Sequence, residues 1–140
     1  MDKKDPKDIT EKEWKEKLTP EQFCVCRQKG TEPANRGKWV KHTGKGTYTC
    51  VACGADLFSS EHKFMSKSGW PSFYMALGTV NGDESRSNII RKEDTSAGME
   101  RTEVLCKRCN SHLGHVFTDG PPPTGLRFCI NSVALDFRPA

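Results

Sequence analysis

The segment best suited to chemistry is Arg127-Phe128-Cys129-Ile130-Asn131, near the end of the 140-residue chain. Successive side chains of an extended strand point to opposite faces, so Arg127, Cys129 and Asn131 would share one face. A guanidinium beside a thiol favours the thiolate, the nucleophilic form of cysteine. A lone cysteine is ordinarily a small buried hydrophobe, but these polar neighbours favour Cys129 as a reactive nucleophile.

A second polar cluster runs from His112 to Phe117. His112 and His115 are three residues apart and would face opposite sides of a regular strand, so both reach one pocket only if the strand is kinked. Gly114 could supply that kink as a β-bulge. Histidine is the usual proton donor near neutral pH, so both residues are candidate acids. The alternative is one structural and one exposed histidine.

A third unusual segment places Trp70 between Gly69 and Pro71. These neighbours fix a large aromatic ring on a loop, where tryptophan is more often part of the core than of a pocket wall. An aromatic ring would also suit a methyl or thioether group, because sulfur packs favourably near such rings.

Four of the seven cysteines form two C-x-x-C pairs, Cys50 with Cys53 and Cys106 with Cys109. Gly54 and Asn110, which follow the pairs, tolerate the positive φ that a zinc knuckle requires. Together the pairs predict one structural zinc ion per chain, joining distant strands and leaving no open position for a catalytic water. The alternatives are a thioredoxin-like redox pair or two unrelated surface turns.

Two helices are expected before the strands begin. Thr10 and Glu13 form a capping box for a short helix that carries Trp14 and Leu18 on one side. The limits of the second helix are given by Thr19, Pro20 and Gln22 at its start and by Gly30 at its end. Its buried face would hold Phe23 and Cys26.

From Gly37 onward, turn residues alternate with short β-prone runs. The predicted strands are residues 38–40, 47–51, 102–106, 116–117 and 126–134. This pattern predicts a mainly β protein of short antiparallel strands. We expect a charged N-terminal extension over residues 1–17 and a single domain over residues 18–140.

Composition excludes several classes of protein. The chain lacks an apolar run long enough to span a bilayer, and its charged N-terminus has no signal-peptide core. A net charge of +4, without a basic run, argues against nucleic-acid binding. An odd number of cysteines argues for a reducing compartment, so we expect a cytoplasmic protein without membrane partners. Nothing in the sequence requires more than a monomer.

Taken together, these segments resemble the B-type methionine-R-sulfoxide reductases. The resemblance runs from Leu18 to Phe137 and includes Leu18-Thr19-Pro20-Glu21-Gln22-Phe23, Gly30-Thr31-Glu32-Pro33, both cysteine pairs, Gly69-Trp70-Pro71-Ser72-Phe73, Arg101-Thr102-Glu103-Val104, His112-Leu113-Gly114-His115-Val116-Phe117 and Pro123-Thr124-Gly125-Leu126-Arg127-Phe128-Cys129-Ile130-Asn131-Ser132. It implies a pair of antiparallel sheets with peripheral N-terminal helices and a structural zinc site.

The resemblance also implies a mechanism. Cys129 would attack the sulfur of methionine-R-sulfoxide, free or in proteins, and become a sulfenic acid while His115 or His112 delivers a proton to the departing oxygen. The remaining implied roles are a methyl-binding wall made by Trp70 and Phe117, and orientation of the site and support of the thiolate by Asn131 and Arg127. Thioredoxin is the implied reductant.

The chain departs from the family pattern at Ser68, where many members carry a resolving cysteine. The spare thiols are Cys24 and Cys26, which lie about 200° apart around the predicted helix, so at most one would face the pocket. Either Cys24 or Cys26 resolves the sulfenic acid after the N-terminal segment moves, or both are bystanders and an external thiol reduces Cys129 directly.

Two other classes of function compete with this interpretation. A zinc-ribbon module that binds a protein partner would need the cysteine pairs but would have no use for Cys129 between Arg127 and Asn131. A nucleic-acid zinc ribbon is opposed by the near balance of 22 basic and 18 acidic residues.

Overall fold

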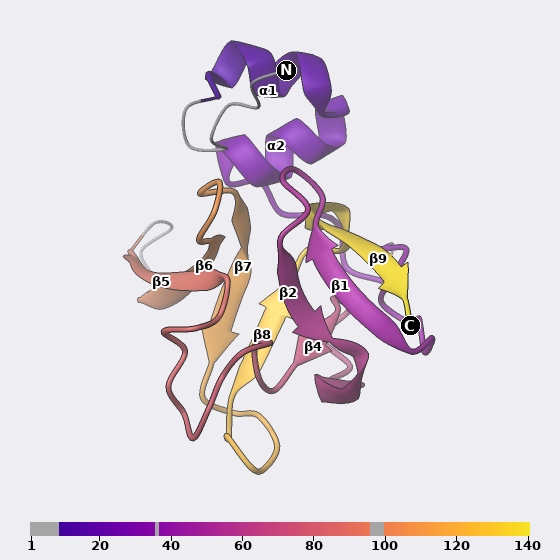
Figure 1. The fold of residues 1–140 in the computed structure, drawn as a ribbon, viewed down its shortest axis with the longest axis vertical. Helices are drawn as coiled ribbons and strands as arrows, with labels where there is room; N and C mark the ends of the chain where they lie inside the picture. The colour runs from indigo at the N-terminus through magenta and orange to yellow at the C-terminus, as the bar shows by residue number, and fades with distance from the viewer. Residues whose placement is uncertain (1–8, 36, 96–99) are drawn as a thin grey trace.

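Two antiparallel sheets lie below a pair of N-terminal helices in the computed structural model, which describes residues 9–35, 37–95 and 100–140 (Figure 1). The helices are α1 (Glu11–Lys17) and α2 (Pro20–Gln28). The strands are β1 (Gly46–Cys50), β2 (Asp56–Ser59), β3 (Lys63–Phe64), β4 (Ser72–Phe73), β5 (Ile89–Asp94), β6 (Arg101–Cys106), β7 (His112–Phe117), β8 (Arg127–Ile130) and β9 (Leu135–Pro139). The mainly β class is confirmed. None of the described helices is both long and apolar enough to cross a membrane.

Both helices begin where their capping boxes predict. The Thr10 and Thr19 side chains each accept a hydrogen bond from the backbone three residues later. The end of α2 differs from the prediction, because Lys29 and not Gly30 adopts the left-handed conformation at the cap. The buried face also differs: Cys26 is buried as expected, but its buried companion is Val25, whereas Phe23 is half-buried.

The strand order is β2-β1-β9 in the smaller sheet and β3-β4-β8-β7-β6-β5 in the larger. The predicted strand at residues 38–40 is wrong, because this run forms turns. Trp39 is held there through its backbone N–H, which donates to Ser132 Oγ, and through its indole, which donates to the Leu135 carbonyl. The predicted strand over residues 126–134 ends at Ile130, and a 3-10 turn, η4 (Ser132–Ala134), leads into β9.

Aromatic rings fill the space between the two sheets. Phe73 of β4 stacks on Phe58 of β2 with ring centroids 4.4 Å apart, and Tyr48 of β1 contacts Phe73 edge to face at 5.2 Å. Phe128 of β8 packs against Phe58, and all four rings are fully buried. Because side chains alternate along a strand, the opposite face of the larger sheet is free to carry polar groups.

Candidate active site and metal centre

Cys129 lies in the middle of a polar row that crosses the larger sheet. Its backbone is in register with Ser72 of β4 on one side and with His115 of β7 on the other. Directly paired residues of antiparallel strands place their side chains on the same face, with Cβ atoms about 5 Å apart. The same row continues to Glu103 of β6, the register partner of His115.

This row opens into a cavity of about 360 Å³. The lining residues are Thr31, Ser68, Trp70, Arg101, Gly114, His115, Phe117, Arg127, Cys129 and Asn131. The predicted common face of Arg127, Cys129 and Asn131 is confirmed, since all three line the cavity. Trp70 and Phe117 line it as well, so the loop tryptophan is part of the pocket wall.

A cluster of three serine hydroxyls lies beside Cys129 on the side of β4, and the Ser68 hydroxyl contacts the Cys129 sulfur. Ser68 Oγ lies 3.5 Å from Cys129 Sγ, and Ser66 Oγ links Ser68 and Ser72 at 2.7 and 2.6 Å. Burial raises the pKa of the Cys129 thiol above its ordinary value, and the Ser68 hydroxyl and the Arg127 guanidinium only partly offset that effect. The surroundings of Cys129 in this structure therefore favour its thiol form over the thiolate.

Arg127 supports the thiolate less than the sequence suggested. Its guanidinium is engaged by Asp119, with Nε to Oδ1 at 2.9 Å and a second nitrogen to Oδ2 at 3.2 Å. It also lies over the Phe117 ring, 4.5 Å from the centroid. Because Asp119 compensates part of its positive charge, Arg127 does not overcome the burial of Cys129.

A β-bulge does lie between the two histidines, but its extra residue is Leu113 and not the predicted Gly114, and only His115 lines the cavity. Val104 of β6 pairs with Gly114, but the next β6 residue pairs with His112, so Leu113 is the extra residue. Gly114 sits beside the bulge, where an added Cβ would overlap the Cys129 carbonyl. The ring centroids of His112 and His115 are 5.5 Å apart.

The environments of the two histidines differ. His115 lines the cavity, and its Nε2 lies 2.8 Å from Asp94 Oδ2. His112 is only 2% exposed and does not line the cavity; its Nδ1 lies 2.6 Å from Glu103 Oε2. Burial lowers the pKa of His112, although the Glu103 carboxylate opposes that effect. Of the two, His115 is the one in position to meet a bound molecule.

Glu32 ties Trp70 and Asn131 to the loop that follows α2. Its backbone N–H donates to Asn131 Oδ1 at 3.0 Å, and its carbonyl accepts the Trp70 indole N–H at 3.0 Å. The Asn131 amide also donates to the Leu113 carbonyl at 3.0 Å, within the bulge. The positions of the Trp70 and Asn131 side chains in the cavity wall therefore both depend on the backbone of Glu32.

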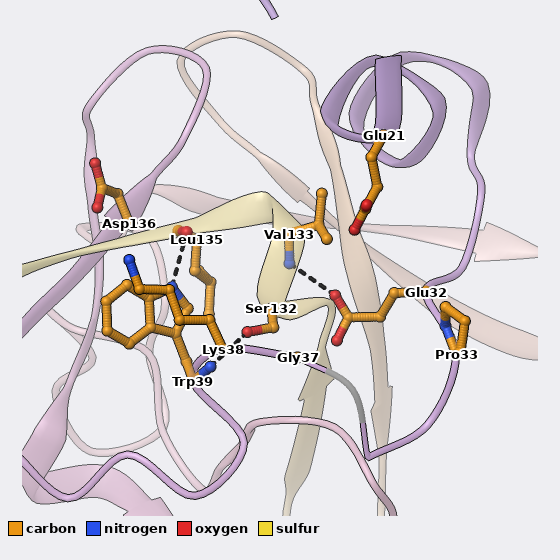
Figure 2. Close-up of a pocket in the computed structure, with 10 residues that line it drawn as sticks. All are labelled: Glu21, Glu32, Pro33, Gly37, Lys38, Trp39, Ser132, Val133, Leu135 and Asp136. Atoms are coloured by element: carbon orange, nitrogen blue, oxygen red, sulfur yellow. Dashed lines mark hydrogen bonds between the residues drawn. The ribbon is translucent and has the colours of Figure 1, made fainter. Parts of the chain in front are cut away.

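A second cavity, of about 320 Å³, lies beside this loop and η4 (Figure 2). Figure 2 shows the Glu32 carboxylate reaching the backbone of η4, where Oε1 accepts the Val133 N–H at 2.7 Å. It also shows Trp39 bound to Ser132 and Leu135 on the other side of that turn. These contacts hold the loop against the chain directly after Asn131.

The four predicted zinc ligands gather in one cluster. Cys50 Sγ lies 3.7 Å from Cys109 Sγ, Cys53 Sγ lies 3.5 Å from Cys106 Sγ, and all four sulfurs are within 4.8 Å of one another. A tetrahedral ion with bonds of about 2.3 Å sets its sulfurs roughly 3.8 Å apart, so the cluster fits such a metal.

The turns that carry these cysteines also match the prediction. Gly54 and Asn110 have φ values of 82° and 62°, and their N–H groups donate to the carbonyls of Cys50 and Cys106. One turn follows β1 of the smaller sheet and the other follows β6 of the larger, both near α2 (Figure 1). A metal bound by these four cysteines would join the two sheets.

Neither spare thiol of α2 lines the Cys129 cavity. Cys24 is exposed, whereas Cys26 is buried, so the two thiols face different ways as predicted. Burial raises the pKa of the Cys26 thiol to about 12, and the nearby Cys109 adds to that effect. Cys24 lies against Gly30, the residue before Thr31 of the cavity wall.

Several residues of the site were not singled out from the sequence. Thr31 and Arg101 line the cavity, Ser72 belongs to the hydroxyl cluster, and Asp94 and Glu103 hold the histidines. The signal available for Glu103 was a carboxylate next to the apolar run Val104-Leu105-Cys106. Asp94 had no comparable signal, because its position depends on strand register.

Comparisons with known proteins identify the family. The SelR domain model matches residues 18–139. A human protein, methionine-R-sulfoxide reductase B2, mitochondrial, is 57% identical over 131 residues, covering 94% of this chain and 72% of the human protein. The peptide methionine sulfoxide reductase MsrB of Thiobacillus denitrificans is 54% identical over 130 residues, covering 93% of each chain. The chain belongs to the SelR family, the B-type methionine-R-sulfoxide reductases.

The relatives include an archaeal protein as well. The peptide methionine sulfoxide reductase MsrB of Methanosarcina barkeri is 56% identical over 129 residues, covering 92% of this chain and 86% of the relative. As a B-type methionine-R-sulfoxide reductase, this chain is an oxidoreductase that acts on methionine sulfoxide.

Proposed function

We propose that this SelR-family protein reduces methionine-R-sulfoxide, free or within proteins, to methionine, with Cys129 as the nucleophile. The observation that carries the proposal is the position of Cys129. Its sulfur shares one cavity with His115 and with the aromatic wall of Trp70 and Phe117. An apolar wall suits the methyl group of the substrate, and a histidine opposite the thiol suits proton transfer.

The proposed reaction needs no group beyond the thiol, the sulfoxide and a proton carrier. The Cys129 sulfur attacks the sulfoxide sulfur and takes over its oxygen, while the sulfur–oxygen bond of the substrate breaks. The thiol proton ends on the transferred oxygen, so thiol and sulfoxide give sulfenic acid and thioether. The methionine sulfoxide is reduced by two electrons to methionine, and the Cys129 sulfur is oxidised by two electrons to the sulfenic acid.

His115 is the proposed proton carrier, because it lines the cavity and His112 does not. The proposed role of Asn131 is to orient the site, since its amide is held between Glu32 and Leu113. The positive charge of Arg127 would stabilise the Cys129 thiolate and so lower the pKa of the thiol. This effect is weakened because Arg127 is paired with Asp119.

The four-cysteine cluster is the proposed site of one structural zinc ion. Cys50, Cys53, Cys106 and Cys109 would supply four thiolates, which fill a tetrahedral site and leave no position for substrate. Such an ion would hold the two sheets together and would take no part in the reduction.

The sulfenic acid must then be reduced, and two routes are open. A thiol attacks the Cys129 sulfur and releases water, and a second thiol reduces the resulting disulfide, with thioredoxin as the proposed final donor. Among the internal thiols, Cys24 is the better candidate for the first attack, because it is exposed and Cys26 is buried. The alternative is direct attack by thioredoxin or a small thiol.

Alkylation and mass spectrometry after one turnover without reductant separate these routes. A disulfide between Cys24 and Cys129 in the wild type, absent from Cys24→Ser but kept in Cys26→Ser, supports internal resolution. A free sulfenic acid with Cys24 still alkylatable refutes it.

We further propose that one chain acts alone in a reducing intracellular compartment, without nucleic-acid or membrane partners. None of the seven cysteines takes part in a disulfide, which suits a reducing compartment. One relative is named as mitochondrial, so the compartment is to be fixed by imaging of the tagged protein.

Turnover of the two epimers of a methionine sulfoxide substrate, with dithiothreitol as reductant, tests the function. We expect reduction of the R epimer only, loss of that activity in Cys129→Ser, and retention in Cys26→Ser. Wild-type protein that holds its metal but is inactive on the R epimer would favour the binding-module alternative instead.

A further inference from the structure

The carboxylates behind the two histidines are buried, and their placement is specific. Asp94 ends β5 and is 4% exposed, while Glu103 lies in β6 and is 2% exposed. Each meets a different histidine: Asp94 contacts His115 at 2.8 Å, and Glu103 contacts His112 at 2.6 Å. Buried carboxylates are costly unless their charge is compensated, so this arrangement calls for an explanation.

Compensating cations reach both carboxylates, and one of them, Arg101, itself lines the cavity. The Lys29 ammonium lies 3.8 Å from Asp94 and 3.4 Å from Glu103, and the Arg101 guanidinium lies 3.8 Å from Asp94. Lys29 adopts a left-handed backbone conformation, φ 59° and ψ 29°, which is unfavourable for a residue other than glycine. This conformation places a cation where it meets the two acids.

We propose that Asp94 is a positioning residue for His115, which holds the imidazole as the Nε2–H tautomer and leaves Nδ1 as the nitrogen available to the reaction. An ionised carboxylate only accepts hydrogen bonds, so the His115 nitrogen that faces it must carry the proton. In the neutral ring the other nitrogen is then an acceptor.

This inference rests on the proposed function and adds a direction to the proton transfer. Cys129 and His115 are register partners that both line the cavity, and we infer that the Cys129 thiol proton passes to His115 Nδ1. The imidazolium thus formed is stabilised by the Asp94 carboxylate and can deliver that proton to the sulfoxide oxygen. Proton count is conserved, since the proton lost by the thiol is the one gained by the oxygen.

Glu103 is less suited to this role. It fixes the ring of His112 and not that of His115, and His112 does not line the cavity. The bulge at Leu113 moves His112 toward Glu103, which leaves Asp94 as the carboxylate bonded to the cavity histidine. The charged and titratable groups around the Asp94–His115 pair are Lys29, Arg101, Glu103 and His112.

The tautomer can be measured directly by NMR of the two ring nitrogens of His115 in metal-loaded, folded wild-type protein at a pH where the ring is neutral. We expect the Nε2–H form to predominate. The Asp94→Asn variant removes the charge, and its amide can donate as well as accept, so the tautomer is no longer fixed. We expect a mixture of tautomers and a fall in kcat/KM of about tenfold or more, mainly in kcat.

The matched control is Glu93→Gln, which removes a carboxylate from the adjacent exposed position of β5. We expect its tautomer and its rate to equal those of the wild type. A predominant Nδ1–H form in the wild type overturns the inference, whether or not Asp94→Asn folds. So does an Asp94→Asn variant whose kcat/KM stays within about twofold of the wild type. If the wild type is inactive on the R epimer, the proposed function fails. The NMR measurement then still tests whether Asp94 fixes the tautomer of His115.

Discussion

Replacement of Glu32 with alanine would remove the side chain that anchors the cavity wall from behind. Its carboxylate is 4% exposed and accepts the Val133 N–H at 2.7 Å. Loss of a charge-assisted bond that leaves a buried donor unpaired costs about 2 kcal/mol. For a domain of this size, that corresponds to a fall in Tm of roughly 6–10 °C, measurable by thermal unfolding.

The same variant should lose activity beyond its loss of stability. Glu32 positions Asn131 and Trp70 through its backbone, and the carboxylate holds that backbone against η4. We therefore expect kcat/KM for methionine-R-sulfoxide to fall well below the wild-type value at a temperature where both proteins are folded. An alanine variant with unchanged Tm and unchanged kcat/KM would refute this reasoning.

Glu32→Gln is the matched control, because its amide oxygen can still accept the Val133 N–H. Burial raises the pKa of Glu32, an effect that the N–H groups of Val133 and Ser132 only partly oppose. The folded state then holds this proton more tightly than the unfolded state does. The contribution of Glu32 to stability therefore falls as pH rises from the unfolded pKa through the raised folded pKa. Above that pH range Glu32→Gln should be at least as stable as the wild type. Its stability should also change less with pH than that of the wild type.

Other variants test the surroundings of Cys129 and the metal centre. Ser68→Ala should shift the pH profile of Cys129 alkylation further upward, because the hydroxyl contact that lowers the pKa of the thiol is lost; a shift downward would contradict this. Ser68→Cys should trap Cys129 as a disulfide after one turnover, since the two side chains are only 3.5 Å apart, and peptide mapping that finds no such crosslink would count against the geometry. Cys53→Ser should reduce the zinc content from one ion per chain and lower Tm, whereas Cys24→Ser should change neither quantity, as elemental analysis and thermal unfolding can establish.

Features set by local chemistry could be predicted from the sequence. Thr10 and Thr19 begin their helices because capping boxes act within one helical turn. Arg127, Cys129 and Asn131 share a face because alternation along a strand is independent of its neighbours. The cysteine pairs form their turns because Gly54 and Asn110 accept positive φ.

Features set by distant contacts could not be predicted in this way. Residues 38–40 have β-prone side chains, but Trp39 is bonded to Ser132 and Leu135, and none of the described strands pairs with this run. The pairing of Asp94 with His115 depends on the registers of β5, β6 and β7 and on the extra residue at Leu113. A single sequence contains no local signal for such registers.

The central claim is that Cys129 takes the oxygen of the substrate, and a single-turnover experiment with a sulfenic-acid trap tests it most directly. Wild-type protein, mixed with methionine-R-sulfoxide without reductant, should form one methionine per chain and one oxidised sulfur, located at Cys129 by peptide mass spectrometry. Cys24→Ser should give the same stoichiometry with the sulfenic acid trapped on Cys129. Methionine formed while Cys129 stays reduced, or undiminished methionine formation by Cys129→Ser, would contradict the account.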